Sequence, residues 1–158
     1  MRPTPAAVSI VVCLALAAAG CTTDHDGARD RAVEQVLAGA NDAKAQLEDL
    51  VEAPDLPRGD GLLDAVRQEV PDDYGNVLTF SQDVVSDETV KVKVAFDGHD
   101  QSGSGGTYLD FTARVCVEFT VTTGMSPGLT TRDTACDQAY FDRTRWLGAA
   151  GEVVSIED

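Results

Sequence analysis

The chain has 158 residues, of which 27 are acidic and 12 are basic, so its formal net charge is −15 at pH 7. This length fits a single domain behind a short leader. Proteins that bind nucleic acids present a basic patch to the phosphates, and an acidic chain without one is not expected to have a nucleic-acid partner. We interpret the acidity as a source of solubility, with mimicry of an acidic ligand or storage of cations as the alternatives.

The N-terminal segment has the order of residues found in an export signal. Arg2 supplies a positive charge, residues 8–19 are uncharged and mostly apolar, and the small residues Ala19 and Gly20 immediately precede Cys21. This pattern is typical of a signal peptide, and the run is shorter than the roughly 20 apolar residues of a transmembrane helix. The segment resembles the signal peptides of bacterial lipoproteins, although Ala18 stands where leucine is usual.

The resemblance implies a lipid anchor. In bacterial lipoproteins a diacylglycerol is attached to the cysteine thiol and a peptidase cuts before that cysteine. Residues 1–20 are therefore expected to be removed and Cys21 to be lipidated. The mature chain would keep 27 acidic and 11 basic residues, a net charge of −16. We expect it at the cell membrane, on the extracytoplasmic face, with residues 21–28 as a tether and residues 29–158 as one domain.

Two helices are predicted after the tether. Apolar residues recur at intervals of three and four between Arg29 and Val51, as on one face of a helix. Pro54 cannot continue this helix. A second helix is predicted from Gly61 to Val70, with Asp60 as its N-cap and Pro71 as its stop. The apolar positions of the first helix are Val33, Val36, Leu37, Ala40, Ala43, Leu47, Leu50 and Val51.

The pattern then changes to the alternation of β-strands. Residues 90–96 alternate valine or phenylalanine with lysine or alanine. In the strand expected over residues 107–121, the odd-numbered residues from Phe111 to Val121 are apolar and should point inward. Residues 97–106 are interpreted as a loop. The further expected strands are 77–85, a return strand over 132–142 with a bulge or a local helix as alternatives, and an edge strand around Val153, Val154 and Ile156.

Cys116 and Cys136 are the two cysteines left in the folded part, because Cys13 leaves with the leader and Cys21 carries the lipid. Two cysteines in an oxidising compartment usually form one disulfide. They are symmetric about Ser126 in a turn-rich segment, so we expect them to face each other across a hairpin. The alternation places Cys116 on the polar face, where the disulfide would be partly exposed. A redox pair or a metal site is the alternative.

The order of these elements predicts an α+β fold. Two N-terminal helices pack on one face of a four- to five-stranded antiparallel meander, which a cross-hairpin disulfide joins.

Few residues in the sequence suggest a catalytic, metal-binding or recognition site. Asp97, His99 and Asp100 offer oxygen and nitrogen ligands for a divalent cation. A solvated hairpin loop is the alternative interpretation of that segment. Tyr140 and Trp146 could form an aromatic recognition patch, or simply pack in the core. No cofactor is expected.

These observations favour a non-enzymatic binding or accessory protein of the cell envelope. Its expected partners are the membrane, through the lipid on Cys21, and another envelope protein. The alternatives are a small cation-dependent hydrolase that uses His99, and a structural surface lipoprotein.

Overall fold

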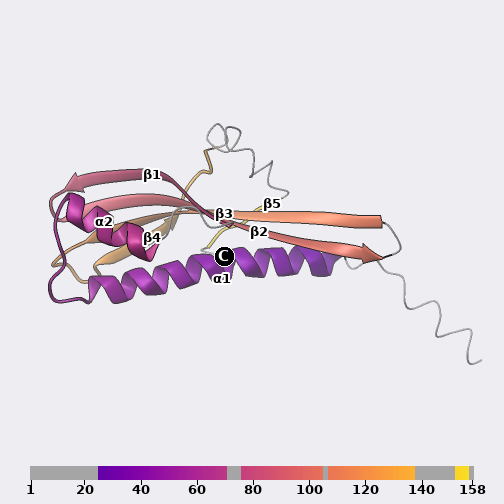
Figure 1. Ribbon diagram of the computed structural model, residues 1–158, viewed down its shortest axis with the longest axis horizontal. Helices are drawn as coiled ribbons and strands as arrows, with labels where there is room; N and C mark the ends of the chain where they lie inside the picture. Colours follow the sequence, from indigo (N-terminus) through magenta and orange to yellow (C-terminus); the bar gives the residue numbers. More distant parts are fainter. Residues whose placement is uncertain (1–24, 71–75, 105–106, 138–151, 157–158) are drawn as a thin grey trace, which may run out of the picture.

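The protein is described by a computed structural model that covers residues 25–70, 76–104, 107–137 and 152–156. It confirms the predicted α+β class, with two helices on one face of a five-stranded sheet (Figure 1). The elements in chain order are α1 (His25–Val51), α2 (Asp60–Glu69), β1 (Val77–Ser86), β2 (Thr89–Ser104), β3 (Thr107–Thr122), β4 (Leu129–Asp133) and β5 (Glu152–Val153).

Helix α1 lies very close to the sheet because its buried face consists mostly of alanine. The fully covered side chains recur every three or four residues, as predicted, and small side chains let a helix approach its neighbour. Opposite Ala32 the sheet carries Gly98, where an added Cβ would lie 2.3 Å from the carbonyl oxygen of Ala32. Backbone therefore packs against backbone here. The buried residues of α1 are Ala28, Ala32, Val36, Ala40, Ala43 and Leu47.

The start of α1 corrects the expected extent of the tether. The helix begins at His25, so residues 25–28 are helical and not an extended tether. Ala28 is 1% exposed and continues the buried face of the helix by one turn. The tether prediction was wrong here because it looked for large apolar side chains, whereas this turn is held by alanine.

Helix α2 completes the helical layer, and its start also differs from the prediction. Asp60 is its first residue and Gly59 is the N-cap, with no side-chain hydrogen bond to the cap. Gly59 has φ 55°, a conformation that glycine adopts without strain, and its N–H donates to the carbonyl oxygen of Asp87 at 2.8 Å. Three of the helix's side chains join the core, namely Leu62, Leu63 and Val66.

Strands β2 and β3 form a continuous antiparallel hairpin, which runs from the pair Thr89 and Thr122 to the pair Ser104 and Thr107. The loop predicted over residues 97–106 was therefore wrong, because β2 continues to Ser104. Apolar alternation stops at Phe96, but the hydrogen bonds to β3 and the contact of Gly98 with α1 keep the segment extended. In Figure 1 this hairpin runs beyond β1 and β4, alongside the N-terminal half of α1.

The remaining strands pair with the two outer edges of this hairpin, β1 with β2, and β4 and β5 with β3. The return strand β4 begins at Leu129 and ends at Asp133, earlier than predicted, and residues 138–142 of the predicted strand lie outside the described part. The edge strand β5 is present, but it pairs parallel with β3, at Ala113 and Arg114. The sheet is thus an antiparallel meander of four strands with one parallel strand added.

The core lies between the two layers, as the alternation predicted. Phe96 and Phe119 meet edge to face at its centre, with ring centroids 6.5 Å apart. The odd-numbered residues of β3 from Ala113 to Val121 are all buried. The even-numbered residues therefore form the opposite, outer face of the sheet.

Candidate functional site

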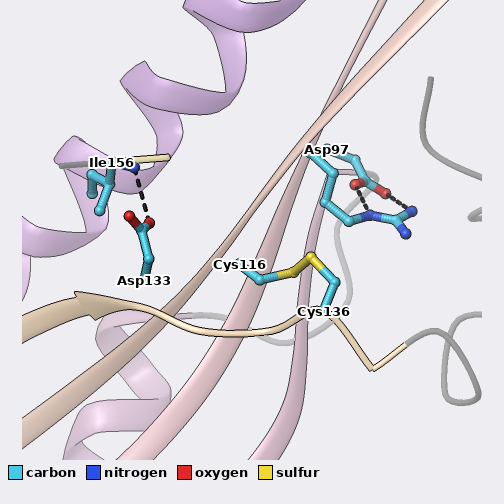
Figure 2. The surroundings of a disulfide bond; sticks show 6 residues. Asp97, Cys116, Asp133, Cys136 and Ile156 are labelled. Carbon is cyan, nitrogen blue, oxygen red and sulfur yellow. Dashed lines mark hydrogen bonds and ion pairs between the residues drawn. A yellow bond between two sulfur atoms is a disulfide. The ribbon is translucent and has the colours of Figure 1, made fainter. Parts of the chain in front are cut away.

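The disulfide between Cys116 and Cys136 is present, and it lies on the outer face of the sheet (Figure 2). The two Cα atoms are 5.5 Å apart. The cysteines are not direct partners across the hairpin, however, because the register pairs Val117 with Asp133. The amide of Thr134 donates to the carbonyl oxygen of Cys116 at 2.9 Å, so Cys136 reaches back from two residues past that point.

The disulfide is partly exposed, as expected, because Cys136 is only partly buried. Cys116 itself is buried. Its exposed fraction is 2%, and it packs with Ala95, Leu78 and Phe80 as well as with Cys136. The outer face thus holds a small apolar cluster of its own. The alternation in the sequence placed Cys116 on the correct face, but it could not show that β1 and the segment after β4 cover it.

A buried ion pair lies beside the disulfide. Arg114 donates from Nε to one carboxylate oxygen of Asp97 at 2.6 Å and from a terminal nitrogen to the other at 3.0 Å. The side chain of Arg114 is only 3% exposed. This two-pronged geometry fixes both side chains and joins β2 to β3. The carboxylate of Asp97 is therefore already paired with a cation within the protein, the guanidinium of Arg114.

The other two residues of the predicted metal site do not join Asp97. Asp100 faces the helix layer and forms an ion pair with Arg31, and this hydrogen bond holds the pKa of Asp100 below its ordinary value. His99 lies on the outer face, with Nε2 3.9 Å from a carboxylate oxygen of Asp110. In the ranges that the structure covers, no three histidine, cysteine or acidic side chains are grouped to hold a metal ion.

Cys21, Tyr140 and Trp146 lie outside the described residues. Cys21 precedes the first residue of α1 by four positions. Within the described ranges, neither helix combines the length and the apolar character that crossing a bilayer would require.

A charged cluster that the sequence prediction missed lies on the outer face, next to the disulfide. Glu118 is 4% exposed, and Arg132 approaches its carboxylate to 2.6 Å. Lys91 and Lys93 approach the same carboxylate to 3.8 and 3.9 Å. We call Lys91, Lys93, Glu118 and Arg132 the basic cluster, because three cations surround one anion. The signal was available in the alternation, which puts all four residues on the outer face once the strands are paired.

An open groove runs between α1 and the C-terminal strand. Arg29 of α1 forms a two-pronged ion pair with Glu152, which raises the pKa of Arg29 and lowers that of Glu152. Asp133 accepts a hydrogen bond from the amide of Ile156 at 2.9 Å, on the helix side of the disulfide in Figure 2. These polar contacts hold β5 and the residues that follow it against the rest of the domain.

Together these features define a disulfide-linked, two-layer α+β domain with a basic cluster on the outer face of its sheet. No family model, no curated protein and no solved structure matches this chain.

Proposed function

We propose that this protein is a lipid-anchored, extracytoplasmic domain that binds another component of the cell envelope without catalysing a reaction. The observation that carries the proposal is the disulfide between Cys116 and Cys136. Such bonds persist in oxidising environments outside the cytosol. A disulfide is therefore consistent with export of the chain by the signal that precedes Cys21. The resemblance to lipoproteins implies that this cysteine is acylated.

The surroundings of His99 favour binding over the alternative of a cation-dependent hydrolase. A hydrolytic metal site needs its ligands to converge with open coordination positions. Here Asp97 is paired with Arg114, and Asp100 is paired with Arg31 on the other face of the strand. A cation would have to displace two arginines and bring ligands from both faces together.

The basic cluster is the surface that we propose for partner binding. Three cations beside one carboxylate are an exception in a chain with a net charge of −15. Lys91, Lys93 and Arg132 are 38%, 36% and 61% exposed, so their charges reach the solvent. Complementary charge promotes association and selects the partner. The partner should therefore present an acidic segment to this face.

Cysteine substitutions test the anchor. Wild-type protein and a Cys13→Ser variant, which changes only the leader, should be recovered in the membrane fraction and released by detergent. A Cys21→Ser variant should be found without lipid, either released from the membrane or with its leader retained. Absence of a lipid from the wild-type protein, or a lipid of the same mass on all three proteins, would contradict the proposal.

Charge reversal tests the binding surface. A Lys91→Glu/Lys93→Glu variant and a matched Lys44→Glu control on α1 are expressed at equal levels, cross-linked in cells and purified. Partners recovered with wild type and with the control should be lost with the double variant. Recovery of nothing above background, or of the same partners with all three proteins, would contradict the proposed surface.

A further inference from the structure

The closing end of the β2–β3 hairpin and the start of α1 lie at the same end of the molecule (Figure 1). Gly98 contacts Ala32, which fixes the register between strand and helix. From Gly98 to Ser104 the strand advances about 20 Å, whereas from Ala32 back to His25 the helix covers only about 10 Å. The hairpin therefore projects about 10 Å beyond the start of α1.

Two large apolar side chains are exposed on this projecting end. Tyr108 is 67% exposed and Leu109 is 39% exposed. They pair with Gly103 and Ser102, so they point to opposite faces of the hairpin. Tyrosine combines an apolar ring with a polar hydroxyl, and it is enriched at the level of lipid headgroups.

The proposed anchor brings this end to the membrane. Cys21 lies four residues before His25, and a chain of that length spans at most about 14 Å. From this reach and the exposed side chains, we infer that the hairpin end contacts the lipid bilayer through Tyr108 and Leu109, so that the long axis of α1 points away from the membrane. The inference rests on the proposed lipid anchor and adds an orientation to it.

Charge opposes the alternative of a domain that lies flat. The solvent-facing side of α1 is strongly acidic, and bacterial and other cell membranes with anionic lipids repel such a surface. An upright domain keeps the part of this side from Glu34 onward away from the headgroups, and only the first turns of α1 lie near them. The 27 residues of α1 extend about 40 Å, so the opposite end of the domain would stand clear of the bilayer. The exposed acidic residues of α1 are Asp26, Asp30, Asp42, Glu34, Glu48 and Asp49.

Quenching by brominated lipids tests this contact in the full lipidated protein. The single tryptophan is removed by Trp146→Phe, and a new one is introduced by Tyr108→Trp or, as a control, by Met125→Trp. Met125 is 66% exposed and lies in the turn between β3 and β4 at the far end, so the two positions match in exposure. Both proteins are reconstituted in phosphatidylcholine vesicles with and without bromine on the acyl chains.

Tryptophan at position 108 should lose about half of its fluorescence in the brominated vesicles, because the interface lies within reach of the bromines, and tryptophan at position 125 should be unaffected. No quenching at position 108, or equal quenching at both positions, in protein whose intact mass includes the lipid would overturn the orientation and leave the anchor standing. A mass without the lipid would overturn the anchor and this inference together.

Discussion

Replacing Gly98 with alanine tests the close contact between α1 and the sheet. A Cβ at this position would lie 2.3 Å from the carbonyl oxygen of Ala32 and 2.9 Å from a methyl group of Val36. The methyl group can rotate away, but the carbonyl oxygen belongs to the helix backbone. The substitution therefore requires α1 to move away from β2.

The expected cost follows from this obstruction. Overpacking a core costs about 1–3 kcal/mol, and a clash with backbone belongs at the upper end of that range. Replacing a glycine also restricts the unfolded chain, and this effect offsets roughly 0.4–1 kcal/mol of the lost stability. We expect Gly98→Ala to lower the free energy of unfolding by about 2 kcal/mol, which shifts the urea midpoint by about 1 M for an m value near 2 kcal/mol/M.

Urea unfolding followed by far-UV circular dichroism measures this shift, with Gly39→Ala as the control. Gly39 is within α1, and a Cβ there would lie 3.3 Å from the ring of Phe96, so the ring must shift by only a few tenths of an ångström and no backbone is obstructed. Because alanine favours helix over glycine by about 1 kcal/mol, the midpoint of the control should stay or rise. Equal midpoints for wild type and Gly98→Ala would refute the backbone contact.

Three further variants test the outer face and the ion pairs. Cys116→Ala, made together with Cys136→Ala, opens a loop of 20 residues and should lower the free energy of unfolding by about 3 kcal/mol, measured in urea. An unchanged urea midpoint would show that the disulfide does not stabilise the fold. Glu118→Gln leaves three cations close together and should cost about 1–2 kcal/mol at low salt and less in 1 M salt, whereas a salt-independent cost would argue against charge repulsion. The pKa of Asp100 is lowered in the folded protein, so its ion pair stabilises the fold above the unfolded pKa of about 3.9, and this contribution is lost as the pH falls through the lower folded value. The Asp100→Asn variant should therefore lose less stability than wild type between about pH 5 and 3, measured as the shift of the urea midpoint. Equal shifts in the two proteins would contradict a stabilising ion pair between Asp100 and Arg31.

The sequence predicted those parts of the fold that depend on side-chain periodicity. Helix spacing and strand alternation located α1 and the inner face of β3, because burial on one face leaves a regular pattern. The extension of β2 beyond Phe96 could not be predicted in this way. It depends on pairing with β3 and on the contact of Gly98 with α1, which only the tertiary structure brings about.

The candidate site, too, could be predicted from the sequence only in part. Counting cysteines predicted the pair Cys116 and Cys136, but symmetry about Ser126 gave the wrong register, since β4 starts at Leu129 and Cys136 lies beyond the strand. The basic cluster combines residues from three strands. Its members are far apart in the sequence, so only the strand order and register show that they surround Glu118.

The lipid on Cys21 is the central claim, and the mass of the N-terminal peptide tests it most directly. Protein purified from the membranes of cells that express the full chain is digested, and its N-terminal fragment is analysed by mass spectrometry. We predict a fragment that begins at Cys21 and carries a diacylglycerol on the sulfur. A fragment with the leader intact, or one that begins elsewhere with no lipid, would contradict the account.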